Sequence, residues 1–98
     1  MNRLSLGIFD SGVGGLTVFK SLVRAFPQEK IIYLGDTAHL PYGDKSSRNI
    51  KRLSLENCLF LINKGVKLIV IACNTSSSIA LEYLRKFFRV PVLGAVSY

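Results

Sequence analysis

Short apolar runs, separated by segments of helical length, constrain the fold of this chain most. Residues 4–9, 31–34 and 66–72 are mostly apolar and too short for helices, so each run predicts a buried strand. Between the runs, apolar residues recur at helical spacing, as Phe19 and Leu22 do. Strands that alternate with helices are typical of a parallel sheet, because parallel strands need a long crossover connection. The sequence therefore predicts a doubly wound α/β fold.

Helix boundaries are predicted from residues that start or stop helices. The second helix is expected to begin at a cap provided by Ser46 or Ser47 and to end at Gly65, a common stop residue. The third helix is expected to begin among the serines at 76–78. It should bury a set of apolar side chains, namely Ile79, Tyr83, Leu84 and Phe87. A last strand is expected around residues 92–96.

The order of the strands follows from the handedness of the crossovers. Right-handed connections and the common strand order 2-1-3-4 place the first and third strands side by side, and put the helices that follow them on opposite faces. Residues 1–98 would then form a single lobe, with a mainly parallel four-stranded sheet and helices on both faces. The carboxyl ends of the first and third strands open one crevice, which is where open α/β sheets bind ligands.

Polar residues follow both of these strands directly. Asp10 and Ser11 come after the first strand, and Cys73, Asn74 and Thr75 come after the third. Residues that are far apart in the sequence should therefore converge at one edge of the sheet. For the thiol, the residues alone leave two interpretations open. It is either a reactive group at the start of a helix or a group packed beneath that helix.

The glycine-rich turn at residues 12–15 allows a second interpretation, because such a turn between a strand and a helix can bind a dinucleotide. The full G-x-G-x-x-G pattern would need glycine where Thr17 stands. Asp36, at the end of the second strand, does resemble the acid that binds a ribose. A nucleotide-binding or plain interaction module of the doubly wound type is therefore the alternative function.

The chain is basic, with 13 Lys and Arg against 6 Asp and Glu and a net charge of +7. Most of the basic residues fall on expected helix surfaces or helix ends, which favours an ordinary solvated surface. We find no nucleic-acid-binding motif and no aromatic residues interleaved with basic ones, as a base-stacking surface would need. We therefore expect no nucleic acid partner.

The lengths of the apolar runs and the few cysteines and histidines argue against a membrane segment, a disulfide and a metal site. The apolar runs are far shorter than the roughly 20 residues of a membrane-spanning helix, and no separate apolar signal region is present. We expect a cytoplasmic protein without membrane contact. Cys58 lies on the apolar face of an expected helix and is interpreted as a core residue, so no disulfide with Cys73 is expected. His39, the only histidine, has no second ligand at suitable spacing, and no metal site is expected.

Four segments resemble one enzyme family. They are residues 7–17 (GIFDSGVGGLT), 33–38 (YLGDTA), 40–43 (LPYG) and 71–75 (IACNT). In this order they are similar to the amino-terminal part of glutamate racemases, within the aspartate/glutamate racemase superfamily. The resemblance extends over essentially all 98 residues, and residues 10–15 resemble the glutamate branch more closely than the aspartate branch.

The resemblance implies a cytoplasmic isomerase that interconverts L- and D-glutamate without a cofactor and supplies D-glutamate for peptidoglycan, and thus for the cell wall and cell shape. In this family the active site lies between two lobes, and two cysteines share the proton transfers. Cys73 would be the cysteine of this lobe, and Asp10 would assist it or contact the substrate ammonium group. The chain would carry half of the site and be inactive alone. Its partners would be glutamate, the second lobe of the same enzyme and a second subunit of a homodimer.

The resemblance also implies a set of substrate-binding residues. Those expected to hold the amino and carboxyl groups of glutamate are Asp10, Ser11, Pro41, Tyr42, Gly43, Asn74, Thr75 and Ser76. A plain turn is the alternative interpretation of the Pro-Tyr-Gly segment. The chain departs from the family pattern in two places. Three serines occupy residues 76–78, and residues 95–98 lack the acidic residue and proline that are common there.

Overall fold

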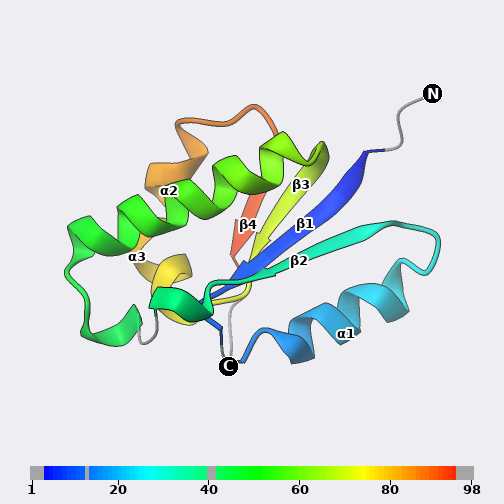
Figure 1. The fold of residues 1–98 in the computed structure, drawn as a ribbon. Helices are drawn as coiled ribbons and strands as arrows, with labels where there is room; N and C mark the ends of the chain where they lie inside the picture. The colour runs from blue at the N-terminus through cyan, green and yellow to red at the C-terminus, as the bar shows by residue number, and fades with distance from the viewer. Residues whose placement is uncertain (1–3, 13, 40–41, 95–98) are drawn as a thin grey trace.

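Four strands and three α-helices form the part of the chain that this computed structural model describes, residues 4–12, 14–39 and 42–94 (Figure 1). The strands are β1 (Ser5–Asp10), β2 (Ile31–Gly35), β3 (Val66–Ile71) and β4 (Val92–Gly94). The helices are α1 (Leu16–Ala25), α2 (Ser47–Asn63) and α3 (Asn74–Arg85). Two short 3-10 helices connect β2 to α2, namely η1 (Thr37–His39) and η2 (Tyr42–Asp44).

The strands form one parallel sheet in the order β2-β1-β3-β4. Ile8 in the middle of β1 pairs with Tyr33 of β2 on one side and with Val70 of β3 on the other. Helix α1 lies on one face of the sheet, and α2 and α3 lie on the other (Figure 1). The predicted fold class and strand order are therefore confirmed, as is the placement of α1 and α3 on opposite faces.

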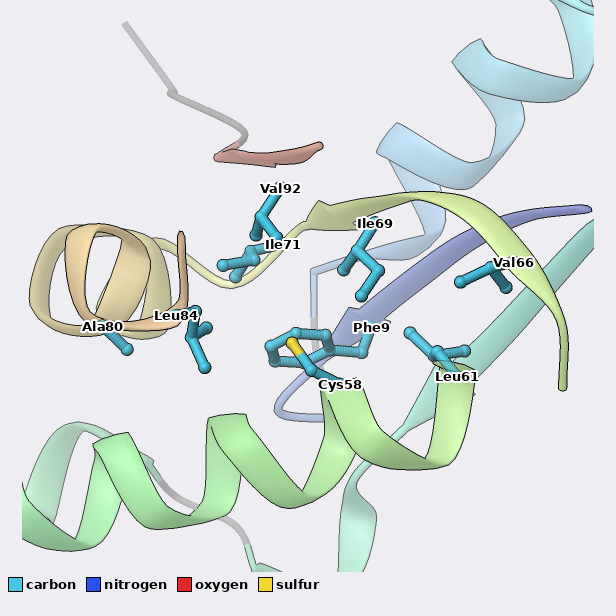
Figure 2. Packing of buried hydrophobic residues seen from close by; sticks show 9 residues of the cluster. All are labelled: Phe9, Cys58, Leu61, Val66, Ile69, Ile71, Ala80, Leu84 and Val92. Carbon is cyan, nitrogen blue, oxygen red and sulfur yellow. The ribbon is translucent and has the colours of Figure 1, made fainter. Parts of the chain in front are cut away.

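The main hydrophobic core lies between the sheet and helices α2 and α3 (Figure 2). Side chains alternate across a strand, so Phe9 of β1 and Ile69 and Ile71 of β3 all point to this face. There they meet Cys58 and Leu61 of α2, and all five side chains are fully buried. Cys58 is thus a core residue, as predicted. Burial raises the pKa of its thiol to about 12, which keeps it protonated near neutral pH.

The opposite face of the sheet has a thinner cover. No residue of α1 is fully buried, and the helix rests on Ile8 of the sheet through partly buried side chains such as Phe19 and Leu22. Leu16 and Val23 also follow the apolar period of α1, yet 52% and 43% of their surfaces are exposed. The helical period was predicted correctly, but it does not reveal that only part of the apolar stripe meets the sheet.

Helix α2 begins and ends close to the predicted residues. Ser46 is its N-cap, and the Ser46 hydroxyl accepts a hydrogen bond from the backbone N–H of Asn49 at 3.2 Å. Gly65 follows the helix with a φ of 83°, a left-handed conformation that favours glycine. None of the helices in the described ranges is long and apolar enough to span a membrane.

Helix α3 differs from the prediction at both ends. It begins at Asn74 with Cys73 as its N-cap, and not among residues 76–78. Serine is a favoured cap, but β3 ends at Ile71 and the chain turns into the helix at once. The predicted burial of Phe87 is also wrong, because α3 ends at Arg85 and 55% of the Phe87 surface is exposed. Of the last expected strand, residues 92–94 are confirmed, and 95–96 lie outside the described residues.

Candidate functional site

Two polar segments meet at the carboxyl edge of the sheet. Phe9 pairs with Ile71, and the backbone N–H of Ala72 donates a 2.8 Å hydrogen bond to the carbonyl of Phe9. This bond extends the pairing of β1 and β3 beyond the last residue of β3. Asp10 and Cys73, which follow directly, are therefore brought to the same edge from opposite ends of the sequence, as the strand order predicts.

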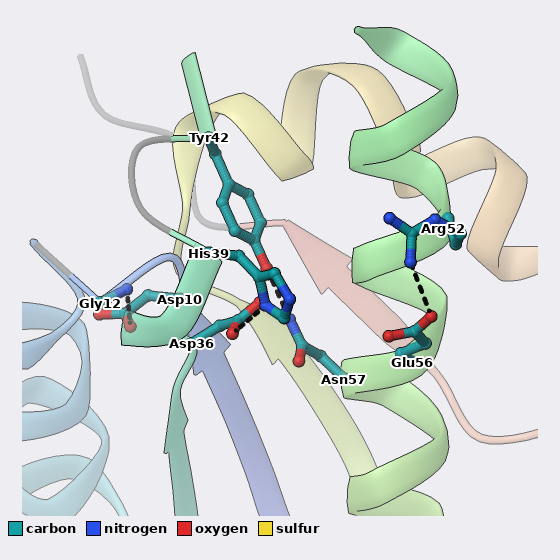
Figure 3. A network of polar contacts seen from close by, with 8 residues as sticks. All are labelled: Asp10, Gly12, Asp36, His39, Tyr42, Arg52, Glu56 and Asn57. Atoms are coloured by element: carbon teal, nitrogen blue, oxygen red, sulfur yellow. Dashed lines mark hydrogen bonds and ion pairs between the residues drawn. The ribbon is translucent and has the colours of Figure 1, made fainter. Parts of the chain in front are cut away.

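Asp10 is fully buried and holds the turn that follows β1. Its Oδ1 accepts a 2.8 Å hydrogen bond from the backbone N–H of Gly12, and its Oδ2 accepts a 2.6 Å bond from the Tyr33 hydroxyl (Figure 3 shows the Gly12 contact). Burial, and then this hydrogen bond and the charge of Asp10, raise the pKa of Tyr33 to about 12. A Cβ at Gly15 would lie 2.0 Å from Oδ2 of Asp10, so the structure requires glycine there.

The same geometry argues against the dinucleotide interpretation. Gly15 is the N-cap of α1, so the Asp10 carboxylate lies at the amino terminus of that helix. A dinucleotide phosphate would bind at this position, where the helix dipole attracts an anion. Asp36, which resembles the acid that binds ribose, is instead hydrogen bonded to Tyr42 and His39. The glycine-rich turn therefore accommodates a side chain of the protein.

Cys73 caps α3 on the side of the sheet that faces α2. Its side chain packs against Tyr42 and Leu53, and 6% of its surface is exposed. The first backbone bond of α3 runs from the N–H of Ser77 to the carbonyl of Cys73, at 2.9 Å. The N–H groups before Ser77 in this first turn have no partner within the helix, and they create a positive field around the thiol.

The catalytic candidates contact different layers. Asp10 bonds with Tyr33 on the α1 face, whereas Cys73 packs with Leu53 on the α2 face. No hydrogen bond joins the two side chains among the residues that the structure describes. The structure thus brings their backbone positions to one edge, while the two side chains have separate surroundings.

A polar network anchors the loop between β2 and α2 (Figure 3). The buried Tyr42 hydroxyl donates a hydrogen bond to Asp36 and accepts one from Asn57 of α2 at 2.9 Å. His39 Nδ1 lies 2.7 Å from Asp36 Oδ1. Burial opposes ionisation of Asp36, but the hydrogen bonds from Tyr42, His39 and Asn57 outweigh it and lower the pKa of Asp36. Burial and the bond to Asp36 raise the pKa of Tyr42.

The other predicted substrate-binding residues differ in how accessible they are. Asn74 and Gly43 are exposed, Thr75 is half-buried, and Ser11 is buried. The Ser76 side chain is fully buried between α2 and α3, where its hydroxyl accepts a 3.0 Å hydrogen bond from Ser54. The Ser76 hydroxyl is therefore closed off from solvent. Pro41 lies outside the described residues.

Sequence reasoning missed several residues that shape this site. Tyr33 lies within a segment that carries the family resemblance, and its hydroxyl turns out to bind Asp10. Asn57 and Ser54 are polar residues on the buried face of α2, where helical spacing predicts apolar ones. Polar residues at such positions need buried partners, and that signal could have directed attention to Tyr42 and Ser76.

The chain is similar in sequence to glutamate racemases. No protein-family model matches it. A glutamate racemase of Geobacter metallireducens is 53% identical over 92 residues, which is 94% of this chain and 34% of the relative. The chain thus spans about a third of the length of the curated relatives it matches, and it corresponds to their amino-terminal part.

Solved structures give the same result. The chain superposes on a glutamate racemase of Thermus thermophilus with a TM-score of 0.90 at 51% identity, covering 94% of this chain and 36% of the other. A glutamate racemase of Francisella tularensis, solved in complex with D-glutamate, has a TM-score of 0.88 at 43% identity, with 96% and 36% coverage. The resemblance that the four sequence segments indicate is confirmed.

Proposed function

We propose that this chain is the amino-terminal lobe of a glutamate racemase, an isomerase that interconverts L- and D-glutamate. The observation that carries the proposal is the likeness to glutamate racemases over nearly the whole chain, including the segment with Cys73 at 71–75. Its position supports a chemical role, because Cys73 stands at the start of a helix and at the edge where such sheets bind ligands.

A racemase must remove the α-proton from one face of its substrate and return a proton to the other. We assign the first task, for one enantiomer, to the Cys73 thiolate, which would take the α-proton and leave a carbanion. An acid on the opposite face, from the second lobe, would then donate a proton to that carbon. In the reverse direction the roles exchange. Two thiols suffice for both transfers, so the proposed mechanism needs no cofactor.

The substrate carboxylate would bind at the amino terminus of α3. The N–H groups of Asn74, Thr75 and Ser76 have no acceptor within the helix, and such groups together with the helix dipole form an anion site. The buried Ser76 hydroxyl faces Ser54, so Ser76 would contribute its backbone N–H.

The remaining predicted residues would surround the substrate from β1 and from the loop before α2. Asp10 would provide negative charge for the substrate ammonium group or assist proton transfer to Cys73, and Ser11 would orient the same group. Gly43, with Tyr42 anchored beside it and Pro41 before it, would leave space for a ligand to approach the backbone, since nothing lies within 4 Å of its Cβ direction.

The family resemblance supports further parts of the proposal. The second lobe of the same enzyme would close the site. The complete enzyme would form a homodimer, act in the cytoplasm and supply D-glutamate for peptidoglycan. Neither nucleic acid nor membrane would be a partner.

The test compares two cysteine variants of the complete enzyme. Cys73→Ser should abolish the conversion of L- to D-glutamate, followed by polarimetry. Cys58→Ser makes the same exchange of sulfur for oxygen at a core residue and should retain turnover. Circular dichroism melts of both variants would separate loss of chemistry from loss of fold. Retained turnover in a folded Cys73→Ser enzyme would refute the proposal.

A further inference from the structure

A concave surface lies on α2 and α3, and none of its residues belongs to the candidate site. It is a groove of about 580 Å³, within the range of about 300–1,000 Å³ that is usual for small-molecule sites. Its lining residues are Arg48, Asn49, Lys51, Arg52 and Leu55 of α2 and Tyr83 of α3.

The groove is strongly basic. Lys51 and Arg52 follow Arg48 by three and four residues, so both lie on the same side of α2 as Arg48 and repel it. Arg52 pairs with Glu56 at 3.1 Å, but both side chains are more than half exposed, at 58% and 55%. Within the described ranges, no ion pair involves Arg48 or Lys51. An anion bound between these cations would relieve their repulsion.

The groove also offers an aromatic surface. The Lys51 ammonium lies 5.5 Å from the centroid of the Tyr83 ring. The Phe87 ring packs against Tyr83 at 4.9 Å, with the two ring planes inclined at 60°. Tyr83 is thus held in place beside Leu55, and both side chains are only half-buried. A flat ring entering the groove would contact Tyr83 and Leu55 while its anionic group meets Arg48 and Lys51.

We propose that this groove binds a small phosphorylated ring compound, with the phosphate on Arg48 and Lys51 and the ring against Tyr83. Arginine favours this ligand class because its planar guanidinium matches the oxygens of a phosphate. The groove is confined to one side of α2 and its junction with α3, which suits a small molecule better than an extended polyanion. The proposal does not depend on the racemase assignment.

The test uses phenyl phosphate as a probe and compares it with its two halves, inorganic phosphate and phenol. Binding to the purified chain is followed by amide chemical shifts in ¹⁵N-labelled protein. We expect saturable shifts at residues 48–55 and at Tyr83, and tighter binding of phenyl phosphate than of either half. Arg48→Gln should weaken binding roughly tenfold, the effect of losing one charged hydrogen bond. Tyr83→Leu should weaken phenyl phosphate but leave inorganic phosphate unchanged.

The matched control is Arg24→Gln, which removes the same charge from the last turn of α1 on the other face of the sheet. It should leave the affinity unchanged. Equal losses of affinity in Arg24→Gln and Arg48→Gln would show that binding depends only on overall charge. Equal affinities for phenyl phosphate and inorganic phosphate would show that the ring contributes nothing. Either result would overturn the proposal. So would displacement of the probe by a short DNA duplex that binds more tightly. Melting curves would verify that each variant folds.

Discussion

Replacing Gly15 by alanine tests how the turn after β1 is built. The backbone of Gly15 has φ −79° and ψ −14°, which alanine adopts without strain. On backbone grounds alone, the change would stabilise the chain by about 0.4–1 kcal/mol. The added Cβ would, however, lie 2.0 Å from Oδ2 and 2.6 Å from Cγ of Asp10, so the carboxylate must move.

The cost of that movement follows from the contacts of Asp10. Its Oδ2 would lose the hydrogen bond from Tyr33, and a bond to a charged group contributes about 1.5–3 kcal/mol. Shifting the backbone to keep the bond would cost a similar 1–3 kcal/mol or so. After the backbone gain is subtracted, we expect Gly15→Ala to lower the free energy of unfolding by about 2 kcal/mol. The melting temperature should fall by roughly 10 °C.

The assay is urea unfolding followed by circular dichroism. Gly43→Ala is the control, because nothing lies within 4 Å of a Cβ there and its free energy of unfolding should change by less than about 0.5 kcal/mol. In an Asp10→Gly background the penalty of Gly15→Ala should largely vanish, because the clashing atoms are gone. If Gly15→Ala were as stable as Gly43→Ala, the proposed contact between Asp10 and the start of α1 would be wrong.

Three further predictions concern the thiols, the loop network and the isolated lobe. Near pH 8, a small alkylating agent should modify Cys73 well before Cys58, because Cys58 is fully buried with a pKa of about 12. Mass spectrometry after partial reaction would identify the modified cysteine, and earlier modification of Cys58 would contradict the prediction. Because folding lowers the pKa of Asp36, its carboxylate stabilises the fold above the unfolded pKa near 3.8, and this stability is lost as pH falls through the folded pKa. The free energy of unfolding of Asp36→Asn should therefore depend less on pH in the acid range. An unchanged dependence would contradict this prediction. The purified 98-residue chain should not convert L- to D-glutamate, because Cys73 reaches only one face of the α-carbon. In deuterated water the chain should at most exchange the α-proton slowly. Sustained formation of D-glutamate would disprove the two-lobe mechanism.

The fold could be predicted from the sequence because local patterns and general chain rules agree. The apolar runs of β1 and β3 are bounded by polar turns, and right-handed crossovers leave few arrangements of such strands. The ends of α2 were predicted because each depends on one local residue: the Ser46 hydroxyl caps the first turn, and Gly65 adopts a left-handed backbone conformation. The start of α3 was not predicted, because Cys73 caps the helix without a side-chain hydrogen bond and the nearby serines are better caps by residue type.

The candidate site was predicted only in part. The meeting of Asp10 and Cys73 at one edge follows from strand order, which the sequence constrains. The direction of the Tyr42 hydroxyl does not, because it depends on Asp36 in the preceding loop and on Asn57 in the third turn of α2. Hydrogen bonds between the side chains of a loop and a neighbouring helix are decided by packing, and a single sequence contains no periodic signal for them.

The central place of β1 in the sheet has a consequence for how the chain folds as it is synthesised. One neighbour of β1 is β2, which follows soon after it, but the other is β3, which is made only after the whole of α2. Until then one edge of β1 has no partner, and pairing across so long a loop is slow. Docking of β3 therefore gives β1 its second partner, and the same event brings the backbone of Cys73 to the edge where Asp10 lies. In a nascent chain, Asp10 and Cys73 would therefore share an edge only after β3 has packed against β1.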